Sequence, residues 1–217
     1  MEDIRTEILT KSPVQIITKE IVIPGKLVNI LFPFIGYLKD QGIQKRINDT
    51  IYDSQLFVKE HKGQERKPEE IWYKDEESGW YQIKTNEFSI LSLLFYYRSF
   101  SYPAWRPRTE ANSLTFDIRS GKNFKLHELF KPGNEYIKIL SDQIKEQIKR
   151  RKIDLLIKFE SIKPDNDFYI ADKCIVVYFQ PNEYACTAQG FLYFPIQIYD
   201  IEDIIPENSI LDRLRYY

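Results

Sequence analysis

Apolar residues recur every three or four positions in two parts of the chain, which is the spacing of an amphipathic helix. The first part covers about residues 38–61, and Asp40 is placed to cap its main body. Its apolar face consists of Leu38, Ile43, Ile47 and Ile51. The second part follows the turn sequence KPGN at 131–134. Its apolar face consists of Tyr136, Ile137, Leu140, Ile144 and Ile148. We therefore predict two long helices.

Other runs have the pattern of strands. VQIITKEIVIP at 14–24 alternates and stops at a proline, and WYQIKTNEFSI at 80–90 also alternates. ILSLLFYYRSFSY at 90–102 is almost wholly apolar up to Arg98, which predicts a central strand covered on both faces. A bulge or turn is expected between these two strands, near 85–87. By contrast, LVNILFPFIGYL at 27–38 is apolar but contains a proline and a glycine, and we interpret it as irregular.

The second half of the chain is rich in β structure. SLTFDIRSGKNFKL at 113–126 contains turn residues between two apolar runs and predicts a hairpin. DFYIADKCIVVYFQP at 167–181 predicts two strands around a turn, and the apolar FLYFPIQI at 191–198 follows. YDIEDII at 199–205 predicts a short acidic helix or turn. Strands in two clusters, without a repeating strand–helix–strand order, predict an α+β fold.

A charged stretch separates the first helix from the strands that follow it. HKGQERKPEEIWYKDEESG at 61–79 contains glycine and proline among mixed charges, which is typical of a loop. We predict two small α+β subdomains, an N-terminal one at 1–100 and a C-terminal one at 101–217. Each is expected to pack an antiparallel sheet against one long amphipathic helix.

Composition and charge narrow the classes of function. A chain of 217 residues with 43% hydrophobic residues can bury a sizeable core. The net charge of −1 excludes the whole-molecule positive field of a general nucleic-acid binder, although local patches remain open. The basic run KRRK at 149–152 falls at the C-terminal end of the second predicted helix, where it complements the helix dipole. We favour that interpretation over nucleic-acid binding.

Targeting signals and cysteines say little about the compartment. The start, MEDIRTEILTKSP, has acids where a signal peptide has basic and then apolar residues, and no apolar run is long enough to span a membrane. As it stands the sequence predicts a cytoplasmic protein, and an extracytoplasmic one if a leader or anchor precedes it. Cys174 and Cys186 lie symmetrically about Gln180 and Pro181. A tight hairpin there would bring them together, so a disulfide and two small buried thiols both stay open.

The sequence contains residue types that catalysis uses, but they do not have the spacing of known catalytic motifs. His61 and His127 form no zinc-binding motif, and neither a nucleophile elbow nor a phosphate-binding loop occurs. Pairs of acids occur in charged loops or expected turns, whereas a glycosidase holds two carboxyls in a cleft. These pairs are Glu69 and Glu70, Glu76 and Glu77, and Asp165 and Asp167. We predict a non-enzymatic protein without metal or cofactor, with a hydrolase as the minor alternative.

The most distinctive candidate for binding is YPAWRPR at 102–108. Tyr102, Trp105, Arg106 and Arg108 are types enriched at interface hot spots, and Trp and Arg can also stack on sugar rings. The two prolines of the segment would reduce the entropy lost on binding. In the alternative interpretation the two aromatic residues close one end of the core while the arginines face solvent.

Two long blocks carry a resemblance to a known family. YYRSFSYPAWRPRTEANSLTFDIRSGKNFKLHELFKPGNEYIKIL and DFYIADKCIVVYFQPNEYACTAQGFLYFPI resemble a domain of unknown function in the extracellular region of lysozyme-sensing anti-sigma factors. The same domain accompanies the catalytic domain of some peptidoglycan deacetylases. FPFIGYLKDQGIQKRINDTI is similar to the companion domain that precedes it. The resemblance covers about residues 14–205 and implies two α+β subdomains that bind a partner in the cell envelope.

The resemblance implies a partner class and also has limits. It implies binding of a lysozyme-like protein or of peptidoglycan. Many members carry a GGAH segment after the tyrosine-rich strand, whereas this chain has PAWRP at 103–107, so no role of that histidine transfers. The expected function is binding of a protein or a cell-wall component. A cytoplasmic structural or interaction protein with the same fold is the alternative.

Overall fold

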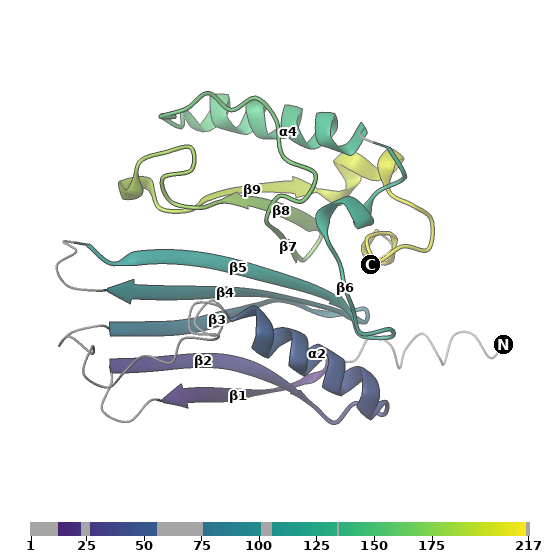
Figure 1. Ribbon diagram of the computed structural model, residues 1–217. Helices are drawn as coiled ribbons and strands as arrows, with labels where there is room; N and C mark the ends of the chain where they lie inside the picture. The colour runs from purple at the N-terminus through teal and green to yellow at the C-terminus, as the bar shows by residue number, and fades with distance from the viewer. Residues whose placement is uncertain (1–12, 23–26, 56–75, 101–105, 134, 216–217) are drawn as a thin grey trace.

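The computed structural model describes residues 13–22, 27–55, 76–100, 106–133 and 135–215 (Figure 1). It confirms the α+β class. The larger of its two sheets has the strand order β1-β2-β3-β4-β5-β6. These strands are β1 (Gln15–Val22), β2 (Leu27–Gly36), β3 (Glu76–Glu87), β4 (Ile90–Phe100), β5 (Arg108–Asp117) and β6 (Lys122–Asn123). The smaller sheet has the order β7-β8-β9, with β7 (Phe168–Ala171), β8 (Cys174–Phe179) and β9 (Leu192–Gln197).

The apolar stretch that looked irregular is β2, so that prediction was wrong. β2 pairs with β1 along its length, from Val22↔Asn29 to Gln15↔Gly36. On its other side it pairs with β3 only over Leu27–Ile30. Pro33, which breaks the sequence pattern of a strand, lies beyond that short pairing. The missing N–H of Pro33 therefore removes no hydrogen bond to β3.

The helix α2 (Gln41–Ser54) lies in the connection between β2 and β3, and these two strands pair in parallel. The predicted cap is confirmed, because an Asp40 carboxylate oxygen accepts a hydrogen bond from the Ile43 amide at 2.9 Å. Ile47 and Ile51 are fully buried against the sheet. The helix ends at Ser54, earlier than the predicted 61, and the predicted charged loop falls outside the described residues except for the part that forms β3. The larger sheet is therefore mixed, whereas we expected an antiparallel one.

β3 and β4 form a hairpin whose turn the sequence did not locate. The turn is Phe88–Ser89, with φ of 52° and 60°. Two successive residues in the left-handed region suit the twist of a tight hairpin, but such a turn normally uses glycine or asparagine. The register between the strands shifts between Ile83 and Thr85, which is the irregularity expected nearby.

β4 is covered on both faces along most of its length, as predicted. Leu91, Leu93 and Phe95 pack on the α2 side of the sheet. Leu94, on the opposite face, packs against Tyr169 and Tyr178 of the smaller sheet. This second contact joins the two sheets, and hydrogen bonds reinforce it: the Ile170 amide donates to Ser92 at 2.9 Å.

The C-terminal half contains the elements that the pattern predicted. β5 and β6 form a hairpin, and α4 (Glu135–Arg151) follows the predicted turn. β7 and β8 are joined at Asp172 and Lys173, and the acidic stretch is the 3-10 helix η4 (Ile198–Ile204). α4 packs over the smaller sheet, so that this sheet lies between α4 and the larger sheet (Figure 1).

The tight hairpin at Gln180 and Pro181 that would have brought the two cysteines together does not form. β8 instead reaches β9 through residues 180–191, which include the 3-10 helix η3 (Thr187–Gln189). Cys174 pairs with Gln197 of β9, and Cys186 is exposed. Both thiols are free.

The boundary predicted at residue 100 lies between β4 and β5. These strands pair from Ser99↔Arg108 to Ile90↔Asp117 within the larger sheet. Their connection spans 101–107, and the described part of it contains only Arg106 and Pro107.

Candidate functional site

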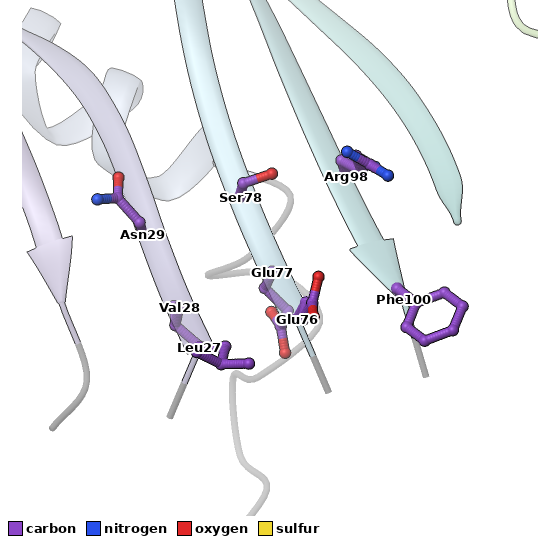
Figure 2. Close-up of a pocket in the computed structure, with 8 residues that line it drawn as sticks. All are labelled: Leu27, Val28, Asn29, Glu76, Glu77, Ser78, Arg98 and Phe100. Carbon is purple, nitrogen blue, oxygen red and sulfur yellow. The ribbon is translucent and has the colours of Figure 1, made fainter. Parts of the chain in front are cut away.

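One end of the larger sheet carries a row of polar side chains that pairing places side by side. Asn29 of β2 pairs with Ser78 of β3, and Ser78 pairs with Arg98 of β4. Residues paired across strands project from the same face, so these three side chains form one row. Figure 2 shows them across the three strands. We call Asn29, Ser78 and Arg98 the polar row.

Two further rows flank the polar row on the same face. Leu27, Glu76 and Phe100 lie two residues nearer the strand ends. Trp80 and Tyr96 lie two residues in the other direction and pair with each other. Their rings are stacked, with centroids 5.2 Å apart and planes at 17°. The side chains of Leu27 and Trp80 are 63% and 38% exposed.

A cavity of about 510 Å³ opens at this end of the sheet. Its lining consists of Leu27, Val28, Asn29, Glu76, Glu77, Ser78, Arg98 and Phe100 (Figure 2). Hydrogen-bonding, charged and apolar groups thus meet in one depression, which is the usual chemistry of a small binding site.

Close packing between β2 and β3 fixes the geometry of the cavity. Gly79 follows Ser78, and a Cβ at Gly79 would lie 2.9 Å from the Ile30 Cγ2 atom. A side chain at this position would therefore clash with Ile30 and disturb the packing of β2 on β3. On the other face of β3, the Tyr97 hydroxyl donates to a Glu77 carboxylate oxygen at 2.5 Å.

The open face carries charged groups as well, among them Arg98 and Glu76, which are both exposed. Asn29 donates from its amide to a Glu20 carboxylate oxygen at 2.6 Å, which orients the amide. The polar row therefore presents an oriented amide, a hydroxyl and a guanidinium to solvent.

An aromatic surface continues from Trp80 towards the smaller sheet. The Tyr96 ring contacts Phe191 edge-on, with centroids 5.6 Å apart. The hydroxyls of Tyr96 and Tyr193 are hydrogen-bonded at 2.8 Å. Burial raises the pKa of Tyr193, and the hydrogen bond with Tyr96 raises it further, so the phenol stays protonated. The Tyr96 ring on which Trp80 stacks is thus held in place by Phe191 and Tyr193. We call Trp80 and Tyr96 the aromatic platform.

Of the four residues predicted from YPAWRPR, the structure describes Arg106 and Arg108, and neither lines the cavity. Tyr102 and Trp105 fall outside the described residues. Arg106 is exposed, and Arg108 forms an ion pair with Glu110. Arg108 pairs with Ser99, the neighbour of Arg98, so it projects from the opposite face. Phe100 of the cavity lies two positions before Tyr102, the first residue of the predicted segment.

Sequence reasoning missed the polar row and the platform. The parallel pairing that brings Asn29 beside Ser78 joins residues almost fifty positions apart, and no local pattern reveals it. The sequence did contain one signal of the site. Arg98 is a charged residue and Trp80 a large aromatic residue, and both occupy exposed positions of otherwise well-formed strands.

Other candidate sites serve the fold. A second cavity, of about 620 Å³, lies at the opposite end of the larger sheet. Two of its polar side chains are already engaged: Asp40 caps α2, and the Asn86 amide bonds both backbone groups of Val14 at 2.9 Å. His127 contacts the Asp165 carboxylate on the surface. Within the described ranges, no group of three or more His, Cys, Asp or Glu residues could hold a metal ion.

Comparisons with known proteins bear on the fold. Residues 127–199 match the model of DUF3298, a family described as a protein of unknown function. A DUF3298 member from Bacteroides fragilis NCTC 9343 is 13% identical, with a TM-score of 0.75 over 96% of this chain and 99% of that chain. A DUF3298 protein from Pseudomonas aeruginosa PAO1 is 12% identical, with a TM-score of 0.71 over 92% of this chain and 97% of that chain.

These likenesses confirm the expectation of a domain of unknown function with this α+β fold. A comparison with curated proteins finds no match. Among the helices of the described ranges, none has the length and apolar character to cross a membrane.

Proposed function

We propose that the chain is a non-enzymatic binding protein and that it binds a cell-wall glycan across the polar row and the aromatic platform. What supports this is the rigid stack of Trp80 on Tyr96 directly beside Asn29, Ser78 and Arg98. An exposed indole offers a flat apolar surface to a sugar ring. The neighbouring amide, hydroxyl and guanidinium can bond the hydroxyl and acyl groups at the ring edge.

Peptidoglycan fits this arrangement in a further respect. Its glycan strands carry peptides that bear carboxylates, and a guanidinium binds a carboxylate through two parallel hydrogen bonds. Arg98 is exposed and lies within the cavity, next in register to Ser78. It is therefore placed to pair with a peptide carboxylate while the sugar lies on Trp80. To bind this ligand the protein must lie outside the cytoplasm, which is one of the two locations that the sequence leaves open.

The state of the two cavity carboxylates favours binding over glycan hydrolysis. A glycosidase acid needs a raised pKa, which comes from burial in a cleft. Glu76 is exposed to solvent, and Glu77 accepts a hydrogen bond from Tyr97 on the other face of β3. The two carboxylates therefore resemble polar lining more than an acid and base held in a closed cleft.

A protein ligand of the lysozyme type is the second candidate. Trp, Tyr and Arg together are the residue types most enriched at hot spots of protein interfaces, and the site contains all three. The flat Trp80 surface favours the glycan, and the experiment below distinguishes the two ligands.

Co-sedimentation with insoluble peptidoglycan tests the proposal, and immobilised lysozyme provides the parallel arm. We expect the chain to bind peptidoglycan and Trp80→Ala to weaken binding by about tenfold, since a central aromatic anchor contributes at least that much. Arg98→Lys should weaken it by a smaller factor, because lysine keeps the charge but loses the forked geometry. Tyr199→Ala is the control, since Tyr199 is an aromatic residue 52% exposed outside the site.

Two results would contradict the proposal. If the chain does not sediment with peptidoglycan, the glycan is not the ligand, and retention on lysozyme that Trp80→Ala abolishes would assign the site to a protein. If Trp80→Ala binds peptidoglycan as the unmodified chain does, the site lies elsewhere. Thermal unfolding of each variant shows whether the fold is kept.

A further inference from the structure

The loop that follows α4 exposes two large aliphatic side chains. Leu156 and Ile157 form a bend, and their side chains are 67% and 61% exposed. They are among the most exposed large apolar residues in the described chain. Their neighbours Ile153 and Leu155 point the other way and pack on the core under α4. We call residues 153–158 the apolar tip.

The apolar tip is held firmly in this outward position. The Ile153 amide donates to the Ile148 carbonyl at 3.1 Å, and the Leu156 amide donates to the Tyr184 carbonyl at 2.8 Å. The Gln189 side chain donates to the Asp154 carbonyl at 3.0 Å. Behind the tip, Phe159 is 5% exposed. Because the backbone is fixed at these points, the two side chains stay largely exposed to water, which is unfavourable for apolar groups.

Basic residues lie close to the apolar tip in the chain. Residues 149–160 contain five basic and two acidic residues, a net charge of +3, while the whole chain carries −1. Arg151 serves the fold, since it donates to the Tyr193 carbonyl at 2.6 Å. Lys158 pairs with Glu160 at 2.8 Å on the surface. Lys149, Arg150 and Lys152 are exposed and form no ion pair with a described residue.

We propose that the apolar tip, with Lys149, Arg150 and Lys152, docks on the surface of an anionic lipid bilayer. Leu156 and Ile157 enter the boundary between headgroups and acyl chains, which removes their side chains from water. The three cations then lie at the level of the lipid phosphates and anionic headgroups. The helix dipole of α4 explains the basic run alone, but it does not explain two exposed aliphatic side chains beside that run.

An anionic bilayer fits these observations better than other polyanions do. A nucleic acid would satisfy the cations but offers no apolar layer to Leu156 and Ile157. The two acids within 149–160, Asp154 and Glu160, still leave that stretch with a net charge of +3. This surface is distinct from the polar row and the aromatic platform, and docking on lipid does not depend on glycan binding.

Vesicle co-sedimentation of the full chain tests the proposal. We use vesicles of phosphatidylcholine alone and of an equal mixture of phosphatidylcholine and phosphatidylglycerol, without any glycan. The chain should bind the anionic vesicles and not the neutral ones, and high salt should weaken binding. Leu156→Ser/Ile157→Ser should weaken it by about tenfold through lost apolar insertion. Lys149→Glu/Arg150→Glu should weaken it by about thirtyfold or more, since each cation contributes about fivefold.

Matched controls separate docking from general effects of charge and hydrophobicity. Val22→Ser removes another aliphatic residue that is 57% exposed, and Lys39→Glu/Lys45→Glu reverses two exposed cations near α2. Both should leave vesicle binding within about twofold, because they lie outside the docking surface. All substitutions are at exposed positions, so each variant is expected to fold, and thermal unfolding verifies it.

Three results would overturn the proposal. One is equal binding of the chain to neutral and anionic vesicles, or binding to neither. A second is unchanged binding by Leu156→Ser/Ile157→Ser, which would reduce the effect to general electrostatic attraction. A third is binding of heparin, a polyanion without an apolar layer, that is as tight as vesicle binding and equally insensitive to the serine variant.

Discussion

The same face of the larger sheet is covered at one end and open at the other, and its polar residues differ accordingly. In the covered half, Ser92, Thr85 and Ser113 are bonded to the smaller sheet: Ser92 accepts from the Ile170 amide, and the other two donate to the carbonyls of Ile170 and Phe168. In the open half, Ser78 and Arg98 line a cavity instead. Within the described chain, no buried side-chain nitrogen or oxygen lacks a hydrogen-bond partner.

The difference teaches how to separate structural from functional polar residues on one sheet. A polar side chain whose partners are all internal is part of the fold, because leaving it unsatisfied would cost stability. A polar side chain kept in water beside a rigid aromatic stack costs nothing to leave unpaired and is free for a ligand. Substitutions made in matched pairs across the two halves can break or sharpen this comparison.

The largest effect is expected from leucine residues. Leu94→Ala should lower the unfolding free energy of the protein by about 3 kcal/mol. Leu94 is fully buried between the sheets, so the change removes apolar contact and leaves a cavity. Leu27→Ala in the open half should change it by less than about 0.5 kcal/mol. Denaturant unfolding measures both values, and similar losses would show that the open half is as tightly packed as the covered half.

An ion pair at the edge of the covered half should give a smaller, pH-dependent effect. Arg213 donates two hydrogen bonds to the two Asp117 carboxylate oxygens, each at 3.0 Å. Burial alone would raise the pKa of Asp117, but the bonds from Arg213 and from the Arg119 amide outweigh it, and the pKa is lowered. We expect Asp117→Asn to cost about 2 kcal/mol at neutral pH, less than for a fully buried pair.

The sign of the pH dependence follows from the lowered pKa. The stabilisation by ionised Asp117 is present above the carboxyl pKa of the unfolded chain and is lost as pH falls through the lower folded value. The gap in unfolding free energy between the unmodified chain and Asp117→Asn should therefore close with acidification. A gap that stays constant from neutral to acidic pH would show that the ionised pair is not its source.

The smallest effect is expected from matched serines. Ser92→Ala removes the acceptor of the buried Ile170 amide and should cost about 1 to 2 kcal/mol. Ser78→Ala leaves no buried group unpaired, and its unfolding free energy should stay within about 0.5 kcal/mol of the unmodified value. Urea unfolding of the two variants side by side makes the test, and a larger loss from Ser78→Ala would assign Ser78 to the fold.

Much of the fold could be predicted from local pattern. Both helices, the Asp40 cap and the both-sided burial of β4 follow from spacing and capping chemistry that neighbouring residues determine. β2 was missed because Pro33 normally argues against a strand, and its position beyond the β3 pairing is a tertiary fact. The irregularity expected near 85–87 is present as the register shift between Ile83 and Thr85. The turn at Phe88–Ser89 itself gave no local signal, because neither residue is a usual left-handed residue.

The candidate site was less predictable than the fold. The sequence drew attention to residues 102–108, of which the structure describes only 106–108. The structure brings Asn29, Ser78 and Arg98 together from three strands. A parallel pair needs a long connection, here one that contains α2, and its register is set by packing such as that of Ile30 on Gly79. No property of either residue alone indicates that packing.

The sequence by itself determined the α+β class, the faces of both helices and the burial of the central strand, because these depend on periodicity within a few residues. Only the tertiary structure decided which polar side chains are hydrogen-bonded within the fold. Ser92 and Ser78 have the same chemistry, and both lie on strands. The smaller sheet covers the position of Ser92 but not that of Ser78. This is the physical reason that one serine holds the fold together and the other faces a cavity.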